Sequence, residues 1–510
     1  MRTLVSSIAD HMKTFVSGAV FLFVIGFHAQ AQMEKAAFSE TGRGAVNAFA
    51  TDYQALGVNP ANLAWGNEYN RRFTMGFLQV GISAYSEALT RENLSSIIFD
   101  REETLTPAEK LAAGEAFTRA DHTLNGDLLL FGAAVQSRTV GNFAFSINFS
   151  NHFYTNLSGP AARQLFTGFL DPYFDQWLVR NATGGVDTIP NQGPGYDRLD
   201  DVIRGFSTNP LPASELYRGS KARALSTVEY SFGYGYTAHE SKNLKFSVGA
   251  GLKYVQGLYI LDLNIDDDGI ASAYTASTPA MDIDYGEAAM GNPSAISGAS
   301  LKSVGSGFGF DLGLNLELSE MFRFGLSIVD IGFLTFDGNV YTARDTAVID
   351  VATLGLNTYN IVDDMDAFVG KDGLFEWDGE EERNVSLPTR MRFGMGYFPL
   401  EWLRLGLDLA VPLNDKPGNP EQMFFAAGMD FVPTSSVRIS AGAATGADYG
   451  LRVPFGLNFV LGEGGWEMGV ATRDILYALR EDQPHLSGTF GFLRYRMGQL
   501  PGVPQSSIFY

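Results

Sequence analysis

The sequence predicts an all-β fold, a transmembrane antiparallel up-and-down β-barrel of about 14 strands. Three observations predict it. Large apolar residues alternate with small or polar ones in segment after segment, the links between these segments alternate between short and long, and no internal segment approaches the ~20 apolar residues of a membrane helix. The composition agrees, since 57 Gly, 39 Phe and 21 Tyr accompany only 18% charged residues.

The N-terminus has the pattern of a secretory signal peptide, predicted to span residues 1–31. An apolar run from Phe15 to Phe27 is followed by Ala29 and Ala31 in A-x-A spacing. The eleven residues before Met12 add nothing that such a signal needs, so we expect translation to start at Met12. Export and cleavage predict an outer-membrane location.

The strand segments lie between residues 72 and 497, the predicted barrel. In "NFAFSINFS", residues 142–150, Phe and Ile occupy one face and small or polar residues the other. An apolar face toward lipid and a wet or plugged interior would produce this pattern. The predicted strands are Phe73 to Tyr85, Asp127 to Gln136, Asn142 to Phe153, Leu225 to Tyr236, Leu244 to Leu263, Gly305 to Leu318, Met321 to Leu334, Arg390 to Phe398, Leu403 to Val411, Met423 to Val432, Val437 to Thr445, Val453 to Leu461, Trp466 to Arg473 and Leu486 to Met497.

The links support the same topology. Tight links such as "SE" and "PTSS" follow every second segment, and longer links follow the others, as expected when one end of a barrel carries periplasmic turns and the other external loops. Helical spacing predicts helices in the long loops at 89–99 and 105–117, capped by Thr90 and Thr106, and at 159–178. Such helices would lid the barrel or contact a partner.

The net charge of −21 argues against nucleic-acid binding, and no cofactor is predicted. The acidic runs fall between strands, as solvated loops do. The run "NIDDDG", Asn264 to Gly269, is similar to the first half of a calcium loop, but Thr275 stands where an EF-hand has Glu. A solvated tip is the favoured interpretation, and no metal site is predicted.

Charged residues on the small face of the strands would point into the lumen. One interpretation is a network that neutralises itself and stiffens the wall; the other is that an Arg anchors a ligand carboxylate. These residues are Glu229, Lys253, Asp311, Glu317, Arg323, Arg392, Arg404, Asp408, Asp430, Arg438, Glu467 and Arg473.

The sequence carries no recognisable catalytic set, so we expect no enzyme activity. The His residues beyond the leader are scattered over different links, and no H-E-x-x-H, G-x-S-x-G, P-loop or G-x-G-x-x-G motif occurs. A lipase-type barrel would need a Ser and a His that meet on the outer wall.

One segment ahead of the first strand does not fit the strand pattern. In "ALGVNPANLAWG", Ala55 to Gly66, Asn59 can cap a short helix whose first residue is Pro60. The stretch from Gly42 to Gly66 resembles the N-terminal signature of FadL-type outer-membrane transporters and of the PorV-like barrels of type IX secretion. The long helix-bearing loops resemble the latter group more.

The resemblance implies that residues 32–71 form a hatch in the lumen, with Asn59, Pro60 and Ala61 in it, and that hydrophobic molecules pass through a lateral opening. Residues 498–510 form a tail that departs from the family pattern, because Pro501 and Pro504 prevent a regular strand.

Three functions follow as hypotheses. The first is an outer-membrane barrel that passes or binds a hydrophobic small molecule. The second is an interaction or scaffold barrel that docks a secretion-system or cargo protein. The third is a purely structural protein whose partner is outer-membrane lipid.

Overall fold

A computed structural model describes residues 38–500, apart from 91–92, 94–103, 138, 360–368, 372, 448 and 480–484. The predicted signal peptide with its start at Met12, most of the tail, and most of the predicted helix at 89–99 lie outside the described residues. At the start of that helix Thr90 Oγ1 accepts the Asn93 N–H at 3.3 Å, as expected of a cap. No helix among the described residues is long and apolar enough to cross a membrane.

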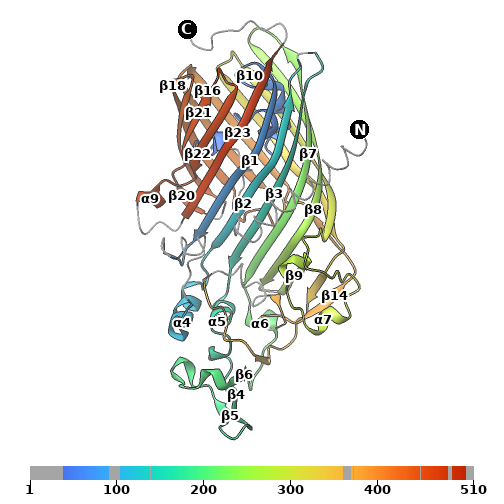
Figure 1. Cartoon of the computed structure of the whole chain (residues 1–510), viewed down its shortest axis with the longest axis vertical. Coiled ribbons are helices and arrows are strands. Elements are labelled where there is room, and N and C mark those ends of the chain that lie inside the picture. Colours follow the sequence, from blue (N-terminus) through green and yellow to red (C-terminus); the bar gives the residue numbers. More distant parts are fainter. Residues whose placement is uncertain are drawn as a thin grey trace.

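The chain forms a closed barrel of fourteen antiparallel strands (Figure 1). Each wall strand pairs with the next along the chain, and the last, β23, pairs with β1. The wall strands are β1 (Arg71–Ser86), β2 (His122–Val135), β3 (Asn142–Asn156), β7 (Lys221–Glu240), β8 (Leu244–Asp266), β10 (Gly305–Leu318), β11 (Phe322–Phe336), β16 (Arg390–Leu400), β17 (Leu403–Pro412), β18 (Phe424–Thr434), β19 (Val437–Gly446), β21 (Phe455–Leu461), β22 (Trp466–Thr472) and β23 (His485–Gln499).

The predicted fold class, with its fourteen strands, is therefore confirmed. Large apolar side chains alternate outward along the wall, and on β10 Phe308, Phe310 and Leu312 are each about half exposed. Between them Gly309, Asp311 and Gly313 face inward. An apolar outer belt is what a bilayer requires of a barrel, because lipid offers polar groups no partners.

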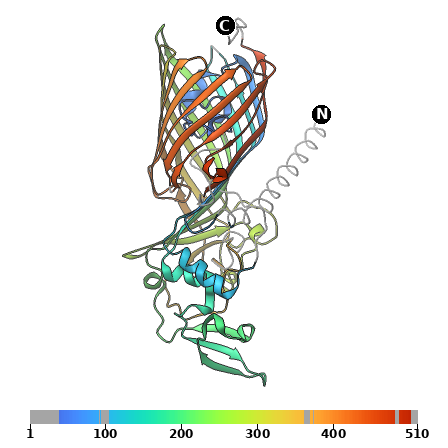
Figure 2. The ribbon, with the colours of Figure 1, turned by 90° about the vertical axis from the view of Figure 1, so that its left-hand side faces the viewer.

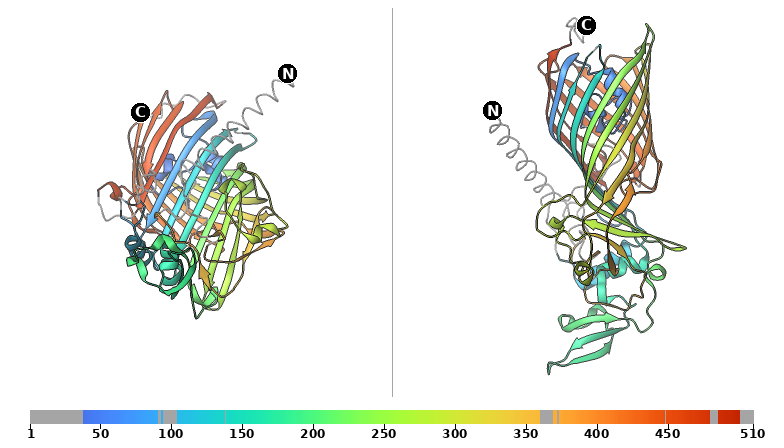
Figure 3. Two further views of the ribbon diagram at one scale, coloured as in Figure 1. Left: turned by 60° about the horizontal axis from the view of Figure 1, so that its bottom comes forward. Right: turned by 90° about the vertical axis from the view of Figure 1, so that its right-hand side faces the viewer.

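The long loops fold into an external unit at one end of the barrel (Figures 2 and 3). Part of it continues the wall, because β7 and β8 run to 20 and 23 residues, far beyond the ~10 that cross a membrane. Its core includes Phe117, Phe166, Tyr217 and Trp377. The elements of this end are α4 (Pro107–Ala116), α5 (Gly159–Thr167), η3 (Gly168–Leu170), β4 (Gln176–Arg180), β5 (Val186–Pro190), η4 (Gly193–Gly195), η5 (Leu199–Asp201), β6 (Val202–Phe206), α6 (Ala213–Leu216), β9 (Gly269–Ser277), η6 (Pro279–Met281), α7 (Glu287–Met290), β12 (Val340–Ala343), β13 (Asp350–Val351), β14 (Trp377–Glu380), β15 (Arg383–Ser386), β20 (Tyr449–Arg452) and α9 (Leu476–Leu479).

Two loop predictions have different outcomes. Thr106 caps α4 in a capping box with Glu109, as its spacing predicted. The helix predicted at 159–178 is wrong in its second half, because α5 ends at Thr167 and Gly168 has φ +51°. Residues from Gln176 onward form β4, which pairs with β5 and β6, so long-range pairing overrides the local helical spacing.

A separate four-stranded sheet, in the order β13-β6-β4-β5, forms the part of the external unit farthest from the barrel (Figure 1). Trp177 is fully buried beneath it and donates its indole N–H to the Phe169 carbonyl at 2.7 Å. The calcium-like run lies at the tip between β8 and β9, where Asp266, Asp267 and Asp268 are exposed. Among the described residues, no group of three or more His, Asp or Glu could hold a metal ion.

Candidate functional site

Residues 38–70, called the plug below, lie inside the barrel at the end with the short turns (Figures 1 and 2). The plug contains α2 (Phe38–Thr41), η1 (Asp52–Ala55) and η2 (Pro60–Trp65), and almost all of its residues are buried. Inward-facing glycines make room for it. A Cβ on Gly249 would overlap the backbone of Pro60 and Ala61, and a Cβ on Gly428 would overlap the Arg43 carbonyl. The glycine-rich inner face of the strands thus fits a backbone that approaches closely.

Asn59 lies at the centre of the contact between plug and wall. Its side-chain oxygen accepts the Ala61 N–H at 3.0 Å and so caps η2. Its amide donates to Asn315 Oδ1 on β10 at 2.9 Å and to Asn47 Oδ1 at 3.2 Å. Asn315 in turn donates to Asn62 Oδ1 at 2.9 Å. Pro60 and Ala61, the other residues of the predicted motif, pack against Gly249 and Gly313.

Charged groups join the plug to the wall at four further places. Arg43 pairs with Asp430 on β18, and Glu68 pairs with Arg404 on β17. Asp408 on β17 accepts the backbone N–H groups of Val46 and Asn47 at 2.8 and 2.9 Å. The last link is between Arg494 on β23 and Asp52, at 2.7 Å. Charge-assisted hydrogen bonds of this kind are directional, so they fix the position of the plug.

Eleven of the twelve charges predicted to point inward lie on the inner face of wall strands, and the twelfth, Arg473, directly follows β22. Eight pair with each other: Lys253 with Asp311 at 3.0 Å, Arg323 with Glu317 at 2.9 Å, Arg392 with Asp408 at 3.5 Å, and Arg438 with Glu467 at 2.9 Å. Arg404 and Asp430 pair with the plug instead. Glu229 lines a cavity described below. Arg473 is buried near the end of the barrel that carries the external unit.

Several partners escaped the sequence prediction. Arg494 and Arg496, which both contact Glu467, follow the same alternation in "FLRYRMG" and could have been found by it. The plug residues Arg43, Asp52 and Glu68 gave no signal, because nothing in their local pattern indicates which strand they meet.

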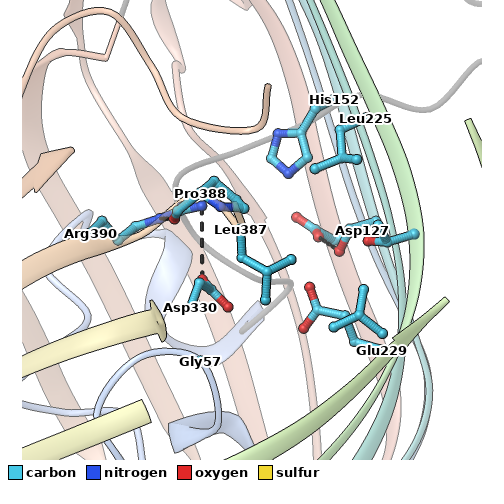
Figure 4. A pocket seen from close by; sticks show the side chains of 12 residues that line it. Gly57, Asp127, His152, Leu225, Glu229, Asp330, Leu387, Pro388 and Arg390 are labelled. Atoms are coloured by element: carbon cyan, nitrogen blue, oxygen red, sulfur yellow. Dashed lines mark hydrogen bonds and ion pairs between the residues drawn. The ribbon is translucent and has the colours of Figure 1, made fainter. Parts of the chain in front are cut away.

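A small cavity lies between the plug and the external unit. Asp127, Glu229 and the apolar side chains Leu225 and Val255 line one side of it. Figure 4 shows Asp330 and Arg390 across the cavity from Asp127 and Glu229. Gly57 of the plug also lines it, and so do Ser150, His152, Thr227, Leu387 and Pro388. The cavity volume of about 30 Å³ has room for about two water molecules.

Asp330 reaches this cavity because β11 is irregular. The pairing of β10 with β11 shifts between Phe310 and Leu312, which leaves one additional residue on β11. Asp330 has φ +60°, and its backbone N–H donates to Asp311 Oδ1 at 2.8 Å. Bulges commonly re-aim a side chain next to a functional site.

The wall has a second irregularity beside the plug. The register shifts between β22 and β23, where β23 has one residue more than β22, and between β2 and β3, where β2 has one residue more than β3. Because β1 pairs with β23 and β2 without a shift, all three strands carry one additional residue at the same height. On β1 this residue is Leu78, with φ +47°. Inside the barrel at this height, Gln79 donates to Tyr53 Oη and accepts from Gln54 Nε2 at 3.2 Å.

A Ser, a His and an Asp meet near the external end of the lumen. Ser83 Oγ lies 2.9 Å from His485 Nε2, and His485 Nδ1 lies 3.9 Å from Asp474 Oδ2. All three side chains are at most 1% exposed. A hydrolase must bring its substrate to the serine oxygen, and burial of this kind does not allow that.

The fold and the filled lumen define the class of protein: an outer-membrane type of β-barrel whose N-terminal segment occupies the interior. Residues 208–464, half of the chain, match the model described as "Family of unknown function (DUF5723)". The chain belongs to this family. No curated protein matches it.

Solved structures similar to this chain include two toluene transporters and a FadL homologue. The Pseudomonas putida transporter TodX has 10% identity over 92% of this chain and 99% of its own, with a TM-score of 0.41. The Ralstonia pickettii transporter TbuX has 10% identity over 92% and 100%, with a TM-score of 0.39. The Pseudomonas aeruginosa FadL homologue has 10% identity over 92% and 100%, with a TM-score of 0.41.

Proposed function

We propose that the protein is an outer-membrane channel that admits a hydrophobic or amphiphilic molecule from outside and releases it sideways through the wall when the plug moves. The observation that carries this proposal is the coincidence of the irregular wall patch on β23, β1 and β2 with the plug contacts of Tyr53 and Gln54. Bulged strands bend and lose regular pairing, so the wall can separate at this patch.

The chemistry of the ligand follows from where such an opening leads. A gap between β1 and β23 would face the hydrocarbon of the bilayer, where Val80 and Phe490 lie. Only a molecule that is soluble in hydrocarbon gains free energy by leaving in that direction. The plug is held by polar contacts that water can replace and by apolar packing of Leu56 and Leu63 against Leu129 of the wall.

The test is a pair of disulfide staples in a chain that has no cysteine of its own. Val80 and Phe490 face each other across β1 and β23, and both point outward. The variant Val80→Cys/Phe490→Cys would join the two strands when oxidised, since directly opposed strand residues lie within disulfide reach. Leu405→Cys/Met429→Cys makes the same staple between β17 and β18, on another part of the wall.

Both variants are expressed in cells with an intact lipopolysaccharide leaflet, and the initial uptake rate of tritiated dodecanol is measured. We expect the first staple to reduce uptake to the level of cells without the protein, with recovery after reduction, and the second to leave it unchanged. Equal effects of the two staples, or no uptake above background by the unstapled protein, would contradict the proposal.

A docking function for the external unit is the second candidate. The observation that favours it is the sheet β13-β6-β4-β5, which has its own buried residues Trp177 and Val179 and takes no part in the wall. Affinity purification of the tagged protein from its native membrane would support docking if one protein is recovered in equal amount, and if its recovery is lost when residues 172–206 are replaced by a short linker.

A further inference from the structure

A buried imidazole lies where the external unit meets the ends of three wall strands. His122 is the first residue of β2 and is 6% exposed, and it is paired across the strands with Ser86 of β1 and Thr155 of β3. Its ring stacks on Phe117, the residue that ends α4, with the ring centroids 4.0 Å apart and the ring planes at 13°. Phe117 packs in turn on Phe166 of α5, at 4.6 Å between centroids. His122 therefore belongs to the contact that holds α4 and α5 on the barrel.

The hydrogen bonds around this ring fix where its single proton lies. Ser86 Oγ accepts the backbone N–H groups of Ala88 and Leu89 at 3.2 and 3.0 Å. Its own hydroxyl proton is therefore donated to His122 Nδ1, 2.8 Å away, so the proton of the neutral ring is on Nε2. Nε2 is buried and has no hydrogen-bond partner in the part of the chain that the structure describes. The site thus fits a neutral imidazole, because a proton on Nδ1 would point at an oxygen that already accepts two N–H groups.

The titratable side chains that the structure describes on the surrounding elements are engaged elsewhere or exposed. Glu87, for example, accepts the Asp121 N–H at 3.1 Å, and Asp121 accepts the Tyr154 hydroxyl at 2.9 Å. These side chains are Tyr85 on β1, Glu87 after it, Asp121 before β2, Tyr154 on β3, Glu109, Lys110 and Glu115 on α4, Arg119 after α4, Arg163 on α5, and Tyr359, which stacks on Phe117. Burial lowers the pKa of His122 to about 3.

We propose that His122 is a proton-operated latch for the external unit: the neutral ring holds α4 against the ends of β1 and β2, and the protonated ring releases it. The latch acts on the external unit and needs no ligand, so it goes beyond the channel proposal. Once α4 has moved away, water solvates the ring and its pKa returns to the ordinary value of 6.5.

The sign of the pH effect follows from the protons that each state binds. Between pH 6.5 and about pH 3 the open contact binds more protons than the closed one. The closed contact is therefore fully stable above pH 6.5 and loses stability as the pH falls. From pH 7.5 to pH 5 the ratio of open to closed contact rises about thirtyfold, and the ordinary pKa alone sets this factor because the closed ring stays neutral over the whole range.

Amide exchange of residues 107–117 measures the latch, since a helix that leaves the wall loses its protection. The full-length protein in phosphatidylcholine nanodiscs is exchanged between pH 7.5 and pH 4, and each rate is divided by that of an unstructured peptide at the same pH. We expect protection to fall about thirtyfold from pH 7.5 to pH 5, beginning near pH 6.5. Glu109 cannot cause this decline, since its pKa lies below the ordinary value of 4.5.

Two variants remove the titration in different ways. His122→Asn offers Ser86 an oxygen acceptor in place of Nδ1, and His122→Phe keeps the stack on Phe117. Both should keep the same protection from pH 7.5 to pH 5, because neither side chain takes up a proton. His239→Asn is the matched control, because His239 is exposed at the short-turn end of β7, and it should show the wild-type decline. Heat-modifiable migration in gels verifies that each variant folds.

Constant protection in the wild-type protein would overturn the latch, and so would the wild-type decline in either His122 variant. If neither variant folds, the shape of the wild-type decline decides. About a tenfold loss per pH unit below pH 6.5 would support the latch. A decline confined to pH values below 4.5, where carboxylates titrate, would overturn it.

Discussion

Replacement of Asn59 by Ala tests whether the plug is held in place by the contacts described above. The change removes the acceptor for the Ala61 N–H and the donated bonds to Asn315 and Asn47. Loss of a helix cap costs about 1 kcal/mol. Loss of each neutral hydrogen bond costs about 1 kcal/mol more. We therefore expect the plug to be held less strongly by about 3 kcal/mol.

Because about 1.4 kcal/mol corresponds to a factor of ten, this loss would raise the ratio of displaced to seated plug about a hundredfold. Single-channel recording in planar bilayers measures that ratio as the fraction of time spent conducting. We expect this fraction to rise by about two orders of magnitude in Asn59→Ala and to stay at the wild-type value in Asn209→Ala, whose side chain is exposed in the external unit.

The Asn59→Ala variant must still assemble into a barrel. Heat-modifiable migration reports it directly, because a folded barrel resists unfolding in detergent at room temperature. An unchanged conducting fraction in a folded Asn59→Ala barrel would refute the view that these contacts hold the plug. Loss of heat-modifiable migration would also refute that view, because it would show that the segment is needed for the barrel to fold.

Three other predictions concern separate parts of the molecule. Asp408→Asn keeps an acceptor for the two plug N–H groups but removes its charge, so the conducting fraction should rise about tenfold, less than in Asn59→Ala. A larger rise in Asp408→Asn than in Asn59→Ala would contradict this expectation. Lys110 of α4, whose ammonium donates to the Leu354 carbonyl at 3.0 Å, is buried within the external unit. Lys110→Met should make that unit sensitive to protease while the barrel stays heat-modifiable, and protease resistance equal to that of the wild type would contradict this. Hydrogen bonds from Thr106 lower the pKa of Glu109 below its ordinary value. The capping box therefore stabilises α4 at a pH above the pKa that Glu109 has in the unfolded chain, and this stabilisation is lost as the pH falls through the pKa of Glu109 in the folded protein. Amide exchange in α4 should accelerate in acid, and Glu109→Gln should remove that pH dependence.

The wall was predictable because its signal is local. A period of two along each strand is set by the lipid on one side and the lumen on the other, so residues 305–318 show their strand and its faces without reference to any other part of the chain. The capping box at Thr106 was predictable for the same reason, since both of its partners lie within one helical turn.

The plug contacts and the external unit were not predictable, because their partners are distant in sequence. Arg43 and Asp430 are 387 residues apart, and no local pattern pairs them. Residues 176–178 have helical spacing, yet they form a strand that pairs with β5 and β6. The additional residue at Leu78 also gives no signal in the sequence, since it exists only relative to the registers of β22 and β3, two strands outside the β23, β1 and β2 group.

A covalent lock between the plug and the wall tests whether the plug must move for a ligand to pass. A Cβ on Gly44 would lie 3.5 Å from that of Ala426 on β18, within the range that a disulfide spans. Gly44 has φ +78°, so cysteine there costs about 1 kcal/mol, which a folded barrel tolerates. Initial uptake of tritiated dodecanol by cells with Gly44→Cys/Ala426→Cys is measured before and after reduction. We expect background uptake in the oxidised protein and full recovery on reduction; the same uptake in both states would mean that the ligand passes without movement of the plug.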